Sequence, residues 1–152
     1  MIYKLYTDGS CSGNPGAGGI GGVFVHNDTD EIFTYSIPIS YTTNNQTELL
    51  AAIYGIDYVL KNYSSIRHVQ INTDAEYVFN GMTGWLDKWI AKGWKTAGNK
   101  PVQNKELWEE LSRLCNNIEV DWVWVKAHAD NKFNNLADKL AREATANAKQ
   151  ER

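Results

Sequence analysis

Residues 7–19 read TDGSCSGNPGAGG, in which an acidic residue, Asp8, is followed by a run rich in glycine. The residues before it, 2–7, predict a first strand, and the glycines predict a turn into a second strand at residues 21–27. Residues 31–39, EIFTYSIPI, predict a third strand. Three strands joined by short turns indicate an antiparallel meander at the start of the chain.

The second half of the chain alternates helices with strands. A helix is predicted from Asn44 onward, with Thr43 or Asn44 as its N-cap, because apolar residues recur at helical spacing. These residues are Leu49, Ile53, Ile56 and Leu60. Residues 68–74 and 120–127 predict two further strands, and a closing helix runs through Leu140. The predicted fold is therefore α/β, with a five-stranded mixed sheet, antiparallel then parallel, flanked by helices.

Length and composition are those of a single globular domain spanning residues 1–152. The chain has 152 residues, of which 43% are hydrophobic, enough to bury one core. No apolar run predicts a membrane span, and the polar N-terminal sequence lacks a signal-peptide core. Cys11 and Cys115 have no zinc-site spacing and are too few for a disulfide framework. We therefore expect a cytoplasmic monomer without zinc, without an obligate protein partner and without a membrane interaction.

Four acidic residues lie at predicted strand ends or helix starts: Asp8, Glu48, Asp74 and Asp138. Each alone has an ordinary structural explanation, as a turn residue or as a charge that complements a helix dipole. Together they predict a carboxylate cluster, because the fold can bring strand ends and helix starts to one edge. Clustered carboxylates repel one another unless a divalent cation lies between them. The sequence thus indicates a metal-dependent phosphoryl-transfer enzyme.

Charge is distributed unevenly along the chain. Residues 81–105 hold five lysines and one aspartate, a local charge of +4 in a chain whose total is −3. Trp85, Trp89 and Trp94 are interleaved with these lysines. A solvated lysine face would explain the charges alone, but aromatic planes beside cations suit sugars and bases. We predict that this basic segment, called the insert below, contacts a nucleic acid.

Four segments resemble the type 1 ribonuclease H family, in particular its compact bacterial branch. They are TDGSCSGNPGAGG, TTNNQTELLAA, INTDAEYV and HADNKFNNLADKLA, in that order, with the insert between the third and fourth acids. The resemblance runs from about Tyr3 to about Ala144. It implies the ribonuclease H-like fold and an endonuclease that cleaves the RNA strand of RNA/DNA hybrids. It also implies two Mg²⁺ ions, with Mn²⁺ as a possible substitute, and a product bearing a 5′ phosphate and a 3′ hydroxyl.

The resemblance assigns a role to each acid. Asp8 is expected to bridge both ions, Asp138 to help hold the ion that activates water, and Glu48 with Asp74 to hold the ion facing the leaving oxygen. His128 is expected to be a mobile proton carrier, a role suited to a near-neutral pKa. A solvated loop histidine is the alternative for that residue.

A second set of residues is expected to select the substrate, since a 2′-hydroxyl both donates and accepts hydrogen bonds and distinguishes RNA from DNA. By resemblance, the RNA strand lies beside Asn14, Asn44 and Asn45, with Cys11 and Glu76 near its minor groove. The DNA strand is expected along Tyr77, Trp89, Lys92 and Lys95, with Thr43 and Asn104 on one phosphate, while Trp85 anchors the packing of the insert. Each asparagine could equally be a turn or cap residue.

The sequence departs from the family pattern at three positions. Tyr41 stands where an arginine is frequent, Glu76 where a neutral side chain is common, and Ala127 where glycine is typical. The first two predict weaker and more salt-sensitive hybrid binding. Two other functions stay open: a resolvase- or integrase-like nuclease of the same fold, and a hybrid-binding module without catalysis. The presence of all four acids favours the enzyme.

Overall fold

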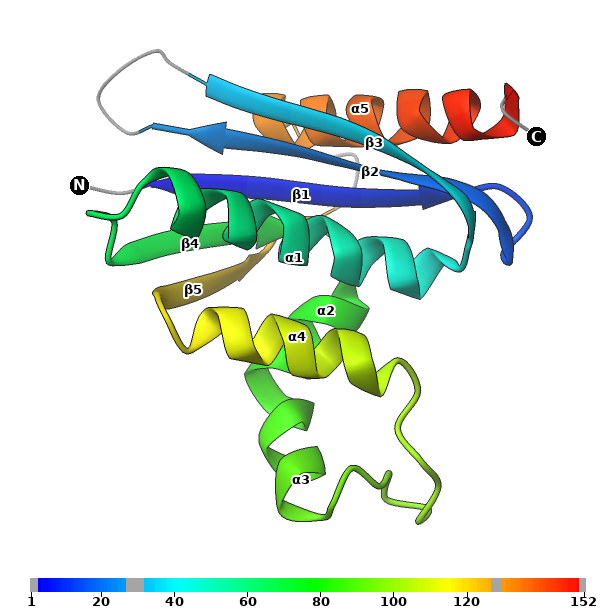
Figure 1. Ribbon diagram of the computed structural model, residues 1–152, viewed down its shortest axis with the longest axis vertical. Coiled ribbons are helices and arrows are strands. Elements are labelled where there is room, and N and C mark those ends of the chain that lie inside the picture. The colour runs from blue at the N-terminus through cyan, green and yellow to red at the C-terminus, as the bar shows by residue number, and fades with distance from the viewer. Residues whose placement is uncertain (1–2, 27–31, 127–129, 151–152) are drawn as a thin grey trace.

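The computed structural model describes residues 3–26, 32–126 and 130–150. Five strands form one sheet in the order β3-β2-β1-β4-β5 (Figure 1). They are β1 (Lys4–Cys11), β2 (Gly16–Val25), β3 (Ile32–Thr42), β4 (His68–Thr73) and β5 (Glu119–Trp124). β2 runs antiparallel to β1 and β3, whereas β1, β4 and β5 run parallel. The predicted mixed α/β sheet is confirmed.

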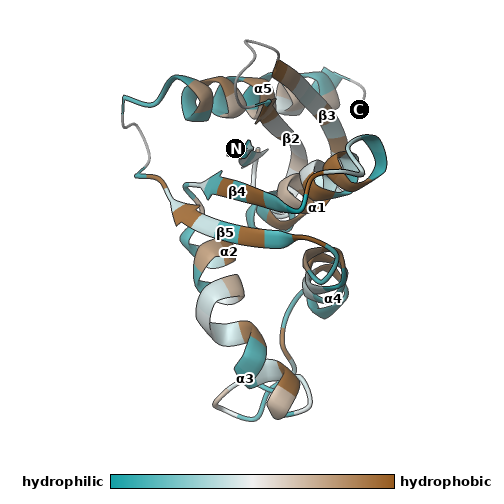
Figure 2. Cartoon of the chain, turned by 90° about the vertical axis from the view of Figure 1, so that its left-hand side faces the viewer, coloured by the Kyte–Doolittle hydropathy of each residue, from teal (hydrophilic) through white to brown (hydrophobic). Residues whose placement is uncertain are grey.

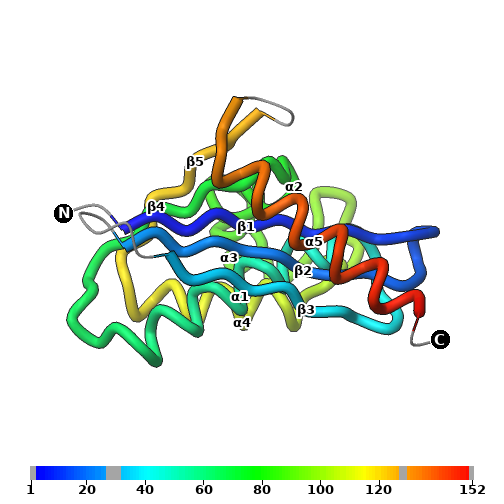
Figure 3. The backbone as a smooth tube through the Cα atoms, turned by 90° about the horizontal axis from the view of Figure 1, so that it is seen from above, coloured from blue at the N-terminus to red at the C-terminus, as the bar shows by residue number. Residues whose placement is uncertain are grey.

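Helices lie on both faces of this sheet. They are α1 (Asn44–Asn62), α2 (Glu76–Asn80), the π-helical turn η1 (Gly81–Trp85), α3 (Leu86–Ala91), α4 (Lys105–Cys115) and α5 (Lys132–Gln150). α5 crosses β1, β2 and β3 on one face, as seen from above in Figure 3, and α1 covers the other face with α4 beside it. Among the described residues, no helix has the length and apolar character required to cross a bilayer.

The main core lies between the sheet and α1. It includes Leu5 and Phe24 from the strands and Leu49 and Ile56 from the helix, all at most 1% exposed. Tyr35 of β3 joins this core, and its hydroxyl donates a hydrogen bond to the Ala51 carbonyl at 2.7 Å. Aliphatic burial of this extent is the main stabilising contribution to folding. It fixes α1 against β1, the strand that carries Asp8.

The opposite face of the sheet is packed by small residues. α5 presents Ala137, Ala141, Ala144 and Ala148 to the sheet, and all four are fully buried. A Cβ on Gly21 of β2 would lie 2.5 Å from the Ala137 carbonyl oxygen, so the helix backbone rests directly on this glycine. The close approach brings the first turns of α5, and with them Asp138, toward β1.

The glycine-rich segment differs from the prediction. β1 continues to Cys11 and β2 begins at Gly16, so most of the predicted turn is strand. Asp8 pairs with Gly21 inside the ladder and does not end its strand, contrary to the expectation for the first acid. The physical reason is that glycine here serves close packing beneath α5, not only chain reversal. Asp74, by contrast, directly follows β4 as predicted.

The start of α1 confirms Thr43 as the N-cap. The Thr43 hydroxyl accepts a hydrogen bond from the Gln46 backbone N–H, and the Gln46 side chain accepts one from the Thr43 backbone N–H. This reciprocal capping box fixes where the helix begins. Glu48 is thereby placed just beyond the first turn.

The insert projects away from the sheet. α3 lies at the far end of this projection in Figure 2, and the chain returns from it to α4. Its base is built on Trp108 of α4, which is fully buried. Trp89 of α3 packs edge-on against Trp108, with ring centroids 5.2 Å apart. The projection is therefore attached to the core by aromatic contacts.

Gly21→Ala should destabilise the protein by about 1–3 kcal/mol, because the added methyl group would push α5 off the sheet. Gly84→Ala is the matched control, since a Cβ there meets nothing within 4 Å and alanine is the better helix former. Chemical denaturation of both variants measures the difference. Equal stability of the two variants would show that α5 does not rest on Gly21.

Candidate active site

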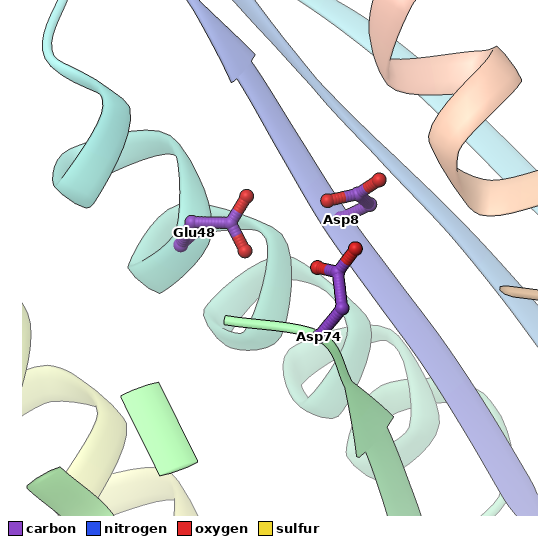
Figure 4. Close-up of side chains that lie close together, drawn as sticks. All are labelled: Asp8, Glu48 and Asp74. Atoms are coloured by element: carbon purple, nitrogen blue, oxygen red, sulfur yellow. The ribbon is translucent and has the colours of Figure 1, made fainter. Parts of the chain in front are cut away.

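Three carboxylates from three different elements converge at one edge of the sheet. Asp8 extends from β1, Glu48 from α1, and Asp74 follows β4, and their side chains point toward one another in Figure 4. Their ligand oxygens all lie within 4.8 Å of one another. Asp8 and Glu48 are buried, at 4% and 7% exposure. Three of the four predicted acids therefore lie together.

Gly9 holds two of these acids in place. Its backbone N–H donates to Asp8 Oδ1 at 2.9 Å and to Glu48 Oε1 at 2.7 Å. A Cβ at this position would lie 2.7 Å from the backbone nitrogen of Glu48, so only glycine lets α1 come this close to β1. The same residue thus provides both the close approach and the amide hydrogen that keeps the two carboxylates side by side.

The electrostatics of the cluster are unfavourable without a cation. Burial, followed by the charges of Glu48 and Asp74, raises the pKa of Asp8 to about 10. Burial and the charge of Asp74 raise the pKa of Glu48 to about 8, although the Gly9 amide acts in the opposite direction. The metal-free cluster therefore retains protons at neutral pH, and these are protons that a bound cation displaces.

The donor set fits a hard divalent cation. All the ligand atoms are carboxylate oxygens, and within the described part of the chain Glu48 Oε2 is buried without a hydrogen-bond partner. A buried, unpaired carboxylate oxygen is costly unless a positive group meets it. Mg²⁺ and Mn²⁺ take such ligands and complete their coordination with water and phosphate oxygens. Asp8, Glu48 and Asp74 would hold the ion.

After burial and the charges of Glu48 and Asp74, a side-chain hydrogen bond with Asp138 also raises the pKa of Asp8. Asp138 therefore belongs to the same site. It lines the cavity of about 450 Å³ that also contains Asp8, Glu48 and Asp74. Its Oδ2 accepts a hydrogen bond from Arg142 Nε at 2.9 Å, one helical turn further along α5, and its side chain is 45% exposed. Asp138 is thus the acid at the open edge of the cavity, held by an exposed ion pair.

A polar hollow of about 550 Å³ adjoins this cavity at the start of α1. It gathers five of the residues expected to bind substrate: Asn14, Thr43, Asn44, Asn45 and Asn104. Asn14 Oδ1 accepts a hydrogen bond from the Asn44 backbone N–H at 2.9 Å, which ties the β1–β2 turn to the helix. Asn44 and Asn45 also line the carboxylate cavity. The two cavities therefore share one wall.

Of the expected substrate-binding residues Cys11, Glu76 and Tyr77, the last two line the carboxylate cavity, whereas Cys11 lines neither cavity. The Cys11 thiol lies 3.4 Å from the Thr42 carbonyl oxygen, to which it donates. Glu76 and Tyr77, at the start of α2, line the carboxylate cavity opposite α5. The Tyr77 hydroxyl accepts hydrogen bonds from Asn104 Nδ2 and from Trp108 Nε1, each at 3.1 Å. Tyr77 therefore joins the site to the insert.

On the insert, aromatic and basic side chains share one surface. Trp85, Lys88, Trp89, Lys92 and Lys95 line a hollow of about 440 Å³. Trp89 contacts Trp85, Trp94 and Trp108, whereas Trp85 is 39% exposed at the surface. Trp85 packs against Tyr77 and Trp89, with ring centroids 6.4 and 5.8 Å apart, whereas Trp89 also packs against Trp108. Trp85 offers the more accessible ring.

Comparison with known families matches residues 2–146 to the family described as RNase H. The chain belongs to the RNase H family. A ribonuclease H of Wolbachia is 46% identical over 145 residues, which span 95% of each chain. The structure of LC9-RNase H1, a type 1 RNase H with the type 2 active-site motif, superposes with a TM-score of 0.82 at 29% identity. That match covers 97% of this chain and 73% of the other.

A third RNase H relative extends the comparison to a substrate complex. LC11-RNase H1, whose structure was solved with an RNA/DNA hybrid, has a TM-score of 0.74 at 25% identity. The match covers 96% of this chain and 98% of that one. Family membership makes the chain an enzyme of the ribonuclease H class, and the carboxylate cluster lies on the fold that this class uses.

Several features of the site could not be predicted from the sequence or were not predicted. The sequence predicts Gly9 only as a turn residue. It gives no role to Arg142, the ion-pair partner of Asp138, or to Asn134, which lines the cavity. Gln46 had a usable signal, because Thr43 followed three residues later by glutamine is a capping-box pattern. Gly9 and Asn134 had no such signal, since their roles depend on contacts between distant segments. His128 and Ala127 lie outside the described residues.

The raised pKa values predict that the metal-free protein loses stability as pH increases. Unfolded Asp and Glu titrate near pH 4. The contribution of Asp8 and Glu48 to stability is therefore greatest below that pH, and it falls as pH rises toward the folded-state pKa values of about 8 for Glu48 and about 10 for Asp8. Asp8→Asn removes a buried carboxyl group that folding must keep protonated as pH rises. It should stabilise the metal-free protein at pH 9 by about 1–3 kcal/mol and have little effect at pH 5.

Thermal unfolding in EDTA at pH 5, 7 and 9 measures this effect, with Asp87→Asn, on the exposed first turn of α3, as the control. A wild-type unfolding midpoint that stays level from pH 5 to pH 9 would contradict the account of the buried carboxyl groups.

Proposed function

We propose that the chain is an endoribonuclease that hydrolyses the RNA strand of RNA/DNA hybrids with two divalent cations. The observation that carries this proposal is the convergence of Asp8, Glu48 and Asp74, with oxygens within 4.8 Å, on an RNase H fold. Cleavage would leave a 5′ phosphate and a 3′ hydroxyl. Mg²⁺ is the proposed physiological ion, and Mn²⁺ a substitute.

Each acid has a distinct task in this proposal. When bound, the cations generate a nucleophilic water and neutralise charge on the attacking and leaving oxygens. Asp8, which interacts with Glu48, Asp74 and Asp138, would contribute to both ions. Glu48 and Asp74 would hold the ion at the leaving oxygen. Asp138, which is half exposed, would exchange Arg142 for the ion at the attacking water.

Selection of RNA would take place in the wall that the two cavities share. Asn14, Asn44 and Asn45 present amides that can both donate to and accept from a 2′-hydroxyl. Glu76, which lines the carboxylate cavity, and Cys11 would lie near the minor groove. A deoxyribose lacks this partner and would leave those amides unpaired. The asparagines thus direct the strand with 2′-hydroxyls toward the carboxylates.

The second strand would follow the insert. Thr43 and Asn104, which line the polar hollow, would contact one of its phosphates. From there the strand would pass Tyr77 and reach the tryptophans and lysines of the insert. Trp85 and Trp89 offer ring faces for sugars, and Lys92 and Lys95 are exposed beside them. Support comes from LC11-RNase H1, a relative solved with a hybrid bound.

Two further points belong to the proposal. His128 would carry a proton for water activation or for product departure, because a histidine titrates near neutral pH. The enzyme would act as a monomer in the cytosol, without an obligate protein partner. Exposed Tyr41, in place of an arginine, would leave the interaction with DNA phosphates weaker than in many relatives.

Asp74→Asn should reduce cleavage to near background while hybrid affinity stays similar or rises slightly. The change preserves shape, removes a charged metal ligand and reduces repulsion of substrate phosphate. Labelled RNA/DNA hybrid, duplex RNA, single-stranded RNA and duplex DNA are incubated with wild type in Mg²⁺ and in EDTA. Only the hybrid in Mg²⁺ should be cut.

Asp87→Asn, on the insert and away from the cavity, is the matched control and should retain cleavage. Near-wild-type turnover by Asp74→Asn would refute the metal assignment. Binding of the hybrid without cleavage by wild type would instead identify a hybrid-binding module. Cleavage of branched or duplex DNA in preference to the hybrid would point to a resolvase-like nuclease.

Replacing both Lys92 and Lys95 by alanine should weaken hybrid binding and reduce its dependence on salt. If each lysine meets one phosphate, the slope of log K against log salt falls by about 1.8, at about 0.9 per contact. Fluorescence anisotropy between 50 and 200 mM salt, with EDTA present, measures the slope. Lys139→Ala with Lys149→Ala, on α5, is the control pair. An unchanged slope in the insert variant would place the DNA strand elsewhere.

A further inference from the structure

Asn134 is a buried polar residue in the wall of the active site. It lies near the start of α5, is 2% exposed, and lines the cavity that contains Asp8, Glu48, Asp74 and Asp138. Its side-chain oxygen Oδ1 is fully buried and has no hydrogen-bond partner among the described residues. A buried acceptor left unpaired is unfavourable, so a hydrogen-bond donor is expected in the cavity.

Local structure does not account for this side chain. An asparagine near a helix start often caps the helix, but here Asn131 does so, since its Oδ1 accepts the Asn134 backbone N–H at 3.0 Å. Asn134 follows inside the helix, where asparagine is a weaker helix former than alanine. Neighbouring positions of the same buried stripe are alanines, such as Ala137 and Ala141. A polar residue in this stripe therefore serves something other than packing.

The missing partner must donate a hydrogen. Ionised carboxylates and phosphodiester oxygens only accept hydrogen bonds, so neither satisfies an amide oxygen. Water bound to a divalent cation donates well, because the cation increases the acidity of the water. Asn134 and Asp138 are four residues apart on one helix, so they lie on the same face, one turn from each other. A cation held between Asp8 and Asp138 would bring its water shell to that face.

We propose that Asn134 is a positioning residue whose buried amide oxygen accepts a hydrogen bond from water on the divalent cation shared by Asp8 and Asp138. The inference rests on the proposed function, because it assumes that the carboxylates bind such a cation. Asn134 would not contact the reacting atoms. It would orient the hydration shell, as outer-shell partners do at other metal sites.

The test is metal binding by substrate-free protein, with Mn²⁺ as the probe. Electron paramagnetic resonance of free Mn²⁺ gives the dissociation constants, and calorimetry with Mg²⁺ checks them. Asn134→Ala should weaken Mn²⁺ binding by about tenfold, the lower end of the range for loss of an outer-shell partner. Its unfolding midpoint in EDTA should equal or exceed that of wild type, because an unpaired buried acceptor is removed and alanine favours the helix.

Two variants complete the test. Asn134→Asp keeps the acceptor oxygens and should bind Mn²⁺ at least as tightly as wild type, whereas Asn147→Ala, exposed at the far end of α5, should change nothing. A lower midpoint of Asn134→Ala in EDTA with unchanged Mn²⁺ affinity would show a purely structural role. Loss of hybrid affinity in EDTA with unchanged Mn²⁺ affinity would show a ribose contact. Each of these results overturns the proposal.

Failure of the proposed function itself would look different. In that case wild type would bind no Mn²⁺, and the variants could not differ from it in Mn²⁺ affinity. If wild type binds Mn²⁺ and Asn134→Ala and Asn134→Asp bind it equally well, the metal site stands and only the assignment of Asn134 fails.

Discussion

The mutual repulsion of buried carboxylates is the constraint on which the rest of this structure depends. Asp8 and Glu48 are held together by one amide hydrogen, from Gly9, and by the packing that forces α1 onto β1. The stability that keeps them there comes from elsewhere, from the aliphatic core under α1 and the alanine face of α5. The fold thus sustains a local arrangement that is unfavourable without cations, as strained functional sites generally require.

Much of the fold could be predicted because its signals are local. Helical spacing located α1, and runs of β-branched and aromatic residues located β4 and β5. The glycine-rich segment was partly misread, since a glycine that allows a helix to rest on a sheet looks the same in sequence as one that allows a turn. The reason for glycine at position 21 becomes clear only from the contact between β2 and α5, where the Ala137 carbonyl leaves no room for a Cβ.

In the site, too, some residues could be predicted from local sequence and others could not. Asp8, Glu48 and Asp74 were identified because carboxylates in recognisable segments are rare and chemically specific. Gly9 and Asn134 could not be found, since one acts through a backbone amide and the other through burial. The different packing of Trp85 and Trp89 was also visible only in the structure. Their spacing permits either ring to face Trp108, and the path of η1 and α3 decides which one does.

A short chain of hydrogen bonds connects the start of α1 to the base of the insert. Gln46 of the α1 capping box donates to Asn104, Asn104 donates to Tyr77, and Tyr77 also accepts from Trp108 at the base of the insert. The start of α1 and the projection are thereby held at a fixed separation. A duplex gripped by the projection would present its other strand to the carboxylates at a set number of nucleotides away. The distance between the insert and the carboxylates, and not the base sequence, would then determine which bond lies at the site.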